Sequence, residues 1–402
     1  MQERTAAPID PALLEKVLRP IERALTLPAE AYRSLEVLAW EKRHFFEGSW
    51  LCIGRSDDVR EPGDQKAVPA GDREVLLVRG DDGILRAFLN SCRHRGHELL
   101  QPGERNHARG VKCPYHGWVY SLEGELKATP RFVDFGSWDV DRSEFPLEAV
   151  PTAEWHAWVF VNFSGDAPEF AEHIGNLGIT VDDYAPETLV LGDSHGYEIR
   201  ANWKIVVENY LECYHCSNIH PELCRVTPPE TGDAPYAELP TGVWTGGPMT
   251  LREHAETMSL DGRSLGTWIP SVPESRRREV GYAAVFPNLL ISPHADYVMT
   301  HRLFPLATDR TSVECNWYFP PAAFERESFT PKYASEFWDV TNREDWAACE
   351  SVQRAVNSGS FHQGPVSSWE IGVYDAMEVV ARGYLEGKLS PPSSSYVDAL
   401  GA

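Results

Sequence analysis

Two short stretches, Cys-Arg-His-Arg-Gly at residues 92–96 and Cys-Pro-Tyr-His-Gly-Trp at residues 113–118, decide the fold of this chain. Each stretch holds one cysteine and one histidine, together with a glycine that favours a tight turn. The four candidate ligands are Cys92, His94, Cys113 and His116. Two loops therefore present a mixed set of thiols and imidazoles that can bind metal.

The order of these ligands separates two kinds of metal site. A Cys₂His₂ set can close a tetrahedral zinc site, so zinc is one alternative. Zinc fingers, however, usually group their cysteines in one pair and their histidines in the other. Here each pair has one of each residue type. This order favours a two-iron cluster, in which two thiolates hold one iron and two imidazoles hold the other.

The two stretches resemble the cluster motif of the Rieske non-haem iron oxygenases. A second motif of that family follows in the expected order, at residues 202–204 (Asn-Trp-Lys), 208–215 (Glu-Asn-Tyr-Leu-Glu-Cys-Tyr-His) and 220–221 (His-Pro). The resemblance covers nearly the whole chain. It implies a terminal oxygenase (alpha) component with a Rieske [2Fe–2S] cluster and a mononuclear Fe(II).

The spacing of the two later histidines requires a break in the helix that carries them. His215 and His220 are five residues apart and would lie roughly 140° apart on a regular helix. Residues 217–221 include helix-breaking types, so both rings can reach one metal if the helix ends or distorts there. The residues alone leave open a helix with ordinary core histidines, or a zinc site that uses the C-x-x-C of Cys213 and Cys216.

The resemblance also implies a complete ligand set for the mononuclear iron. His215, His220 and Asp345 match two histidines and one carboxylate, which leave coordination positions open for dioxygen and substrate. The helix that carries Asp345 has three other acidic residues nearby, and these are competing candidates: Asp339, Glu344 and Glu350.

The resemblance assigns the link between the two centres to a carboxylate. Glu212 matches the family residue that joins the Rieske histidine of one subunit to the iron histidine of its neighbour. Such a carboxylate also fixes the tautomer and orientation of the histidine. Glu208, one turn earlier, is the competing candidate, and Asn209 lies beside it in the same motif.

The form Glu-Cys-Tyr-His at residues 212–215 is similar to the branch that oxidises quaternary ammonium compounds such as carnitine, glycine betaine and stachydrine. The predicted reaction is hydroxylation or N-demethylation of such a substrate, and an aromatic-ring or aromatic-acid hydroxylating dioxygenase is the alternative. Aromatic faces bind quaternary ammonium ions through cation–π attraction. The candidate pocket residues are Trp244, Trp268, Tyr282, Phe286 and Tyr297.

The patterns along the chain predict an α+β protein in three parts. Residues 1–45 read as N-terminal helices that pack on the catalytic domain, one beginning at Asp10-Pro11 and one spanning residues 34–46. Residues 46–165 read as a small all-β Rieske domain. Residues 166–402 read as a catalytic domain whose antiparallel sheet is covered by helices. In that domain we predict strands at 280–293, 297–305 and 311–319, and helices at 342–356 and 368–385.

Composition limits the location and partners of the protein. The net charge of −23 argues against nucleic-acid binding. No apolar run is long enough to cross a bilayer, and no signal sequence is evident, so a cytoplasmic protein is predicted. The cysteines outside the cluster are expected to be reduced thiols, as is usual in that compartment.

The sequence has no Rossmann glycine fingerprint and no plant-type ferredoxin run, so a separate flavin/iron–sulfur reductase is expected to supply electrons from NAD(P)H. The resemblance implies a homotrimer or an assembly of trimers. A Rieske electron-transfer protein is the alternative from another class, but it would not need the second motif.

Overall fold

The computed structural model describes residues 5–131, 141–231 and 238–393, and it divides the chain into two compact units. One unit is formed by residues 50–167, and the other combines residues 2–49 with 168–402. The N-terminal helices therefore belong by their contacts to the larger, C-terminal unit. The sequence had placed the corresponding domain boundaries at residues 46 and 166.

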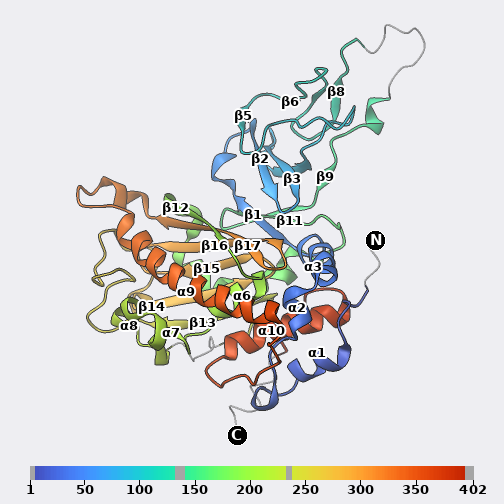
Figure 1. The fold of residues 1–402 in the computed structure, drawn as a ribbon. Helices are drawn as coiled ribbons and strands as arrows, with labels where there is room; N and C mark the ends of the chain where they lie inside the picture. Colours follow the sequence, from blue (N-terminus) through green and yellow to red (C-terminus); the bar gives the residue numbers. More distant parts are fainter. Residues whose placement is uncertain (1–4, 132–140, 232–237, 394–402) are drawn as a thin grey trace. The chain divides into compact units, whose positions relative to one another are not determined.

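The smaller unit is built from short antiparallel strands in three sheets (Figure 1). The sheet orders are β1-β11-β10, β5-β2-β3-β4-β9 and β6-β7-β8. The strands are β1 (Leu51–Arg55), β2 (Asp64–Ala70), β3 (Arg73–Arg79), β4 (Leu85–Leu89), β5 (Arg105–His107), β6 (Val111–Lys112), β7 (Val119–Tyr120), β8 (Leu126–Ala128), β9 (Ala149–Val150), β10 (Thr152–Trp155) and β11 (Trp158–Val161). One hydrophobic cluster ties the cysteine-bearing loops to the five-stranded sheet, because Cys92 and Cys113 pack with Leu76 and Phe88 in the same core.

The larger unit is organised around a six-stranded antiparallel sheet in the order β12-β17-β16-β15-β14-β13. The strands are β12 (Val190–Ile199), β13 (Trp244–Thr250), β14 (Glu279–Val285), β15 (Leu289–Pro293), β16 (Val298–Ala307) and β17 (Arg310–Phe319). The predicted strand at 280–293 is in fact a hairpin of β14 and β15, and β12 and β13 were not predicted. The helical covering and antiparallel sheet confirm the α+β class.

Helices cover this sheet and bring distant parts of the chain together (Figure 1). They are α1 (Pro11–Val17), α2 (Ala29–Arg33), α3 (Leu35–Glu41), α4 (Phe170–Ile174), α5 (Gly178–Val181), α6 (Trp203–Tyr210), α7 (Cys216–Ile219), α8 (Pro221–Val226), α9 (Lys332–Ser358) and α10 (Ile371–Glu386). The long helix α9 packs against α6 and β12, and α6 also contacts β16 and α10. No helix in the described part of the chain is long and apolar enough to cross a membrane.

The helix starts follow local capping chemistry. The Asp10 side chain accepts a hydrogen bond from Ala12 N, with Pro11 at the first helical position of α1. The Ser34 side chain accepts one from Val37 N at the start of α3, and a π-helical turn extends this helix to Phe46. These two helices lie where the sequence predicted them. Helix α9 begins at Lys332, ten residues before the predicted start at 342.

Candidate active site

The two cysteine-histidine loops of the smaller unit have nearly the same backbone geometry. In the first loop, Cys92 N donates to His97 O at 2.9 Å and Gly96 N donates to Cys92 O at 2.9 Å. In the second, Cys113 N donates to Trp118 O at 2.8 Å and Gly117 N donates to Cys113 O at 3.1 Å. The two glycines have φ angles of 72° and 74°, which other residues rarely adopt. The shared turn geometry explains why both motifs need glycine at this position.

The side chains of these loops pair by type. The thiols of Cys92 and Cys113 are buried close to each other and form no disulfide. The rings of His94 and His116 lie 4.6 Å apart between centroids, and His116 is exposed. Two thiols on the inside and two imidazoles on the outside fit a cluster with one iron on each pair.

A tyrosine supports the inner end of this site. The Tyr120 hydroxyl lies 3.3 Å from the Cys92 sulfur and accepts a hydrogen bond from Arg93 N at 3.0 Å. The Trp118 ring stacks on His94, with centroids 4.9 Å apart. Hydrogen bonds to ligand sulfur tune the reduction potential of an iron–sulfur cluster, and Tyr120, which the sequence analysis did not name, is positioned to make one.

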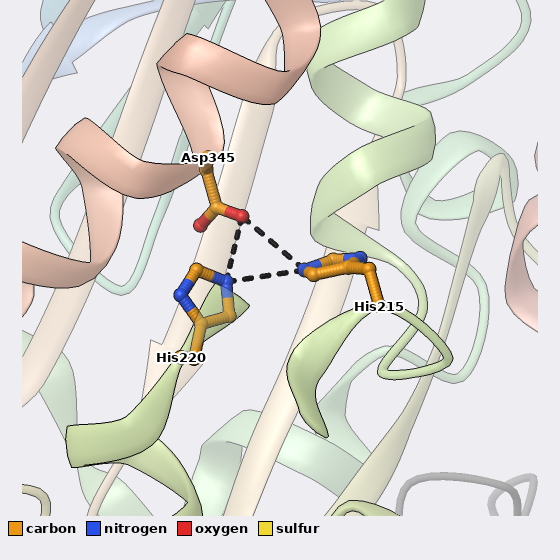
Figure 2. Close-up of side chains that lie close together, drawn as sticks. All are labelled: His215, His220 and Asp345. Atoms are coloured by element: carbon orange, nitrogen blue, oxygen red, sulfur yellow. Dashed lines mark hydrogen bonds and ion pairs between the residues drawn. The ribbon is translucent and has the colours of Figure 1, made fainter. Parts of the chain in front are cut away.

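In the larger unit, three predicted ligands converge on one point (Figure 2). His215 Nε2, His220 Nε2 and Asp345 Oδ1 form a triangle with edges of 3.2, 3.2 and 2.9 Å. Adjacent ligands are spaced like this around an ion that they bind at roughly 2.1 Å. The donor set of two imidazoles and one carboxylate, with other positions open, fits a mononuclear Fe(II).

The chain breaks on both sides of α7 to bring the two histidines together. Helix α6 ends at Tyr210, His215 precedes the single turn of α7, and His220 follows it with φ −118° and ψ 72°. The predicted break between the histidines lies at His220, and a second break, which was not predicted, precedes His215. Asp345 reaches the same point from the middle of α9.

Each histidine has a carboxylate on its other ring nitrogen. Glu212 contacts His215 Nδ1 and accepts a hydrogen bond from His215 N at 3.1 Å. Glu344 lies 2.7 Å from His220 Nδ1. Such carboxylates fix the imidazole tautomer that leaves Nε2 free for the metal. The sequence analysis considered Glu344 only as a rival ligand. In the structure Glu344 instead contacts the Nδ1 side of His220, away from the shared metal point.

The electrostatic surroundings favour a positive charge at the point where His215, His220 and Asp345 meet. Burial lowers the pKa of His215, but the carboxylates of Asp345 and Glu212 outweigh it and raise that pKa to about 10. Burial would raise the pKa of Asp345, but His215 and His220 outweigh it and hold that pKa below its usual value. A metal cation would take the place of the protons that these groups otherwise attract.

The other acidic candidates lie elsewhere. Asp339 accepts a hydrogen bond from Tyr197 at 2.7 Å, and Glu350 accepts one from Arg200 N at 3.2 Å. The Glu208 carboxylate accepts hydrogen bonds from the Tyr32 hydroxyl at 2.9 and 3.1 Å. Burial raises the pKa of Glu208 to about 8. None of these three carboxylates forms part of the His215–His220–Asp345 group.

The C-x-x-C motif does not provide thiol ligands. Cys213 and Cys216 form a disulfide with each other, which corrects the expectation that both are reduced thiols. Their sulfur atoms are therefore engaged, which removes the basis for the alternative of a zinc site around His215. The other six cysteines, all within the described residues, form no disulfide.

A cavity lies beside the three ligands, between the sheet and the helices α6, α7 and α9. Its volume, counted as space open to the centre of a water molecule, is about 70 Å³. One water needs roughly 10–15 Å³, so the cavity can hold a small organic molecule. Asn209 and Glu212 contribute to the wall, together with four aromatic residues: Tyr210, Tyr282, Trp338 and Trp346.

Of the five predicted pocket residues, one lies in the wall of this cavity. Tyr282 lies in the wall, but Trp244, Phe286 and Tyr297 are buried in the core and Trp268 is partly exposed beside Arg277. One of the aromatic residues that were missed, Trp338, could have been predicted from its spacing to Asp345. Trp338 lies seven residues before Asp345 on α9, and therefore on the same helix face.

Comparisons with known proteins identify both domains of the chain. Residues 49–140 match the model of the Rieske [2Fe–2S] domain, and residues 186–386, half of the chain, match that of the ring hydroxylating alpha subunit (catalytic domain). The glycine betaine monooxygenase oxygenase subunit of Chromohalobacter salexigens is 29% identical over 90% of this chain and 86% of its own. The carnitine monooxygenase oxygenase subunit of Escherichia coli is 35% identical over 50% of this chain and 53% of its own.

A solved structure shares the fold. The quaternary ammonium Rieske monooxygenase CntA, with an inhibitor bound, aligns with a TM-score of 0.76 at 24% identity, over 95% of this chain and all of that one. The family models and the two sets of ligand residues lead to one assignment. This chain belongs to the ring hydroxylating oxygenase alpha subunits, which combine a Rieske [2Fe–2S] domain with a mononuclear iron catalytic domain.

Proposed function

We propose that the protein is the oxygenase component of a multicomponent system that hydroxylates or N-demethylates a small quaternary ammonium compound. The observation that carries this proposal is the group His215, His220 and Asp345 beside a small cavity with aromatic walls. The names of the relatives, glycine betaine and carnitine monooxygenase oxygenase subunits, support the same substrate class.

The residues of the cavity have separate tasks in this proposal. His215, His220 and Asp345 would hold the Fe(II), and an iron with open coordination positions supplies dioxygen activation when it is bound. Glu212 and Glu344 hold the two imidazoles in the orientation that binding requires. The aromatic faces bind the ammonium group, each contact contributing roughly 0.5–2 kcal/mol. They thereby keep an N-methyl group near the open positions.

The proposal includes two partners. A separate reductase would deliver electrons from NAD(P)H to the cluster at Cys92, His94, Cys113 and His116. Because NAD(P)H is held inside cells, this partner supports a cytoplasmic location. We also propose a homotrimer, or an assembly of trimers, in which Glu212 connects the cluster of one subunit to the iron of the next. A closed ring gives every iron one such neighbour.

An aerobic substrate screen with a surrogate reductase tests the function. NADH use, product and formaldehyde are measured together for quaternary ammonium compounds and for aromatic acids, with Asp345→Ala as the control for uncoupled NADH oxidation. Formaldehyde in proportion to a demethylated product is expected from an ammonium compound. Hydroxylation of an aromatic acid, with no turnover of ammonium compounds, would instead establish the aromatic alternative.

A further inference from the structure

The wall of the cavity contains side chains that a strong oxidant attacks. Indole and phenol rings give up an electron more easily than most other side chains, and four of them line the cavity beside the iron ligands: Tyr210, Tyr282, Trp338 and Trp346. Dioxygen that is activated without a well-placed substrate leaves an oxidising equivalent next to these rings. The wall is therefore damaged unless the oxidation moves on to a group outside the cavity.

Trp346 connects this wall to the protein surface. It follows the ligand Asp345 on α9 and lines the cavity. Its ring meets that of Tyr197 on β12, with centroids 5.9 Å apart and ring planes at 60°, which is the geometry of aromatic rings in edge contact. Tyr197 is partly exposed to solvent. Because rings in contact exchange electrons readily, an electron can pass from the surface through Tyr197 and Trp346 to the cavity.

A tyrosine gives up its electron easily only if a base takes the phenolic proton, and Tyr197 has such a base. Its hydroxyl donates to Asp339 Oδ1 at 2.7 Å and lies 3.2 Å from His195 Nδ1. The side chains of Asp339 and His195 are 27% and 30% exposed, so the proton can pass on to water. Tyr210 in the wall differs, because it donates to the backbone carbonyl of Ile291, which cannot take up a proton.

A second tyrosine–carboxylate pair lies further from the wall and serves as a comparison. Tyr333 donates to Asp296 at 2.6 Å, but the rings that it contacts do not line the cavity. Asp296 is fully buried and also accepts hydrogen bonds from two other hydroxyl groups. This carboxylate cannot release a proton to water. Contact with the wall and access to solvent are thus combined at Tyr197 and not at Tyr333.

We propose that Trp346 and Tyr197 form a redox outlet, which carries unspent oxidising equivalents from the iron cavity to the protein surface. In each event Trp346 gives one electron to the metal point. Tyr197 replaces that electron and passes its phenolic proton to Asp339, which releases it to water. A small thiol in solution then gives a hydrogen atom to the Tyr197 radical, which restores the phenol and leaves a thiyl radical. The inference rests on the proposed function and goes beyond it, because no organic substrate takes part in this protective reaction.

Hydrogen peroxide, added to the iron-loaded protein without substrate, tests the outlet because it supplies oxidising equivalents directly at the metal. The cluster is oxidised beforehand, so that it provides no electrons. Freeze-quenched samples of the wild type should show a tyrosyl radical by EPR, and ring-deuterated tyrosine should change its hyperfine pattern. Tyr197→Phe should lose this signal, and mass spectrometry should find more oxidation of Trp346. Tyr333→Phe should keep the wild-type signal.

Two further variants test the proton acceptor and the source of the oxidation. Asp339→Asn keeps a hydrogen-bond acceptor for Tyr197 but removes the carboxylate base, so the yield of the radical should fall. This variant provides the test if Tyr197→Phe does not fold, and melting temperatures report folding. Asp345→Ala, without the mononuclear iron, should form no radical. Glutathione, mixed in after the radical has formed, should discharge it in the wild type.

The outcomes separate this inference from the proposed function. A full tyrosyl signal in folded Tyr197→Phe overturns the outlet, and its loss in Tyr333→Phe alone assigns the radical to the other pair. If the wild type demethylates ammonium compounds but forms no tyrosyl radical, the inference is overturned while the proposed function stands. If the radical forms as expected but the substrate screen finds no product, the outlet stands and the proposed function fails. A protein that binds no mononuclear iron overturns both.

Discussion

At the scale of single residues, neighbouring carboxylates of the iron site have different tasks because of helix geometry. Glu344 and Asp345 are consecutive on α9, so their side chains leave the helix roughly 100° apart. Only one can reach the point shared by His215 and His220. Asp345 does so, and Glu344 instead contacts the Nδ1 side of His220.

A first prediction separates the ligand from its supporting carboxylate. Asp345→Ala should lose the mononuclear iron and all product formation, because a three-ligand site cannot spare one ligand. Its Rieske absorption spectrum should persist. Glu344→Gln should keep activity with iron affinity reduced roughly 10- to 100-fold, as is typical when a supporting carboxylate is removed. Iron analysis and absorption spectra check both variants. Full iron and turnover in Asp345→Ala would show that the ligand assignment is incorrect.

At the scale of elements, helices and strands were predictable where local patterns are strong. The caps of α1 and α3 could be predicted because Asp10 and Ser34 act on their own neighbours. The first ten residues of α9 were missed, since their helical structure depends on packing rather than on a sequence cap, and Pro331 provides no side-chain cap. The edge strand β12 was missed because only its last residue is buried and it lacks a hydrophobic run.

The candidate site was predictable to a similar degree. His215, His220 and Asp345 could be named because they follow a motif, although their convergence needs two helix breaks. The positions of Glu344 and Tyr120 could not be named from the sequence, because each depends on contacts between residues far apart in the chain. Of the predicted pocket aromatics only Tyr282 lines the cavity, for the same reason.

A second prediction concerns a buried ion pair where helices α3, α6 and α10 pack together. Lys204 Nζ lies 2.5 Å from Glu41 Oε1, both side chains are buried, and Glu41 also accepts hydrogen bonds from Trp203 and Tyr384. Glu41→Ala should lower the free energy of unfolding by about 3–5 kcal/mol, because it leaves a buried cation without a partner. Denaturant titration measures the change.

The matched control is an exposed ion pair of the same unit. Glu256 binds Arg263 at 2.9 Å, with side chains that are 42% and 61% exposed. Glu256→Ala should change stability by less than about 1 kcal/mol, as is usual for exposed pairs. Equal effects of Glu41→Ala and Glu256→Ala would contradict a structural role for the buried pair.

At the scale of the whole molecule, the reaction requires two metal centres that lie in separate units of the chain. A third prediction tests whether electrons pass between subunits. Cys92→Ser should disable the cluster and Asp345→Ala the iron, so each variant alone should be inactive. Co-expressed in equal amounts, they should recover about a quarter of wild-type activity, because one ordered neighbour pair in four of a randomly mixed ring joins an intact cluster to an intact iron. Activity of purified mixed oligomers checks this, and no recovery would indicate transfer within one chain.

The last prediction concerns the residue that would connect these centres. Glu212→Gln keeps the size of the side chain but removes its charge and one acceptor. The variant should keep its assembly state and, with excess iron, both metals, since Glu212 is not a ligand in the group of His215, His220 and Asp345. Its iron affinity should fall roughly 10- to 100-fold, as for Glu344→Gln, because Glu212 supports His215 in the same way. Electron transfer from the reduced cluster should nevertheless slow severely, because the link between the cluster histidine and His215 is lost. Absorbance of the cluster during a single turnover of pre-reduced enzyme measures this rate.

Glu208→Gln provides the matched control for this experiment. Burial raises the pKa of Glu208 to about 8, so this carboxyl is largely uncharged at pH 7, and glutamine imitates it closely. Its partner is Tyr32, outside the iron site. We therefore expect near wild-type cluster reoxidation in Glu208→Gln and slow reoxidation in Glu212→Gln. Wild-type rates of reoxidation and product formation in fully metallated Glu212→Gln would rule out the connecting role. A slow Glu208→Gln variant would instead transfer that role to the carboxylate one turn earlier.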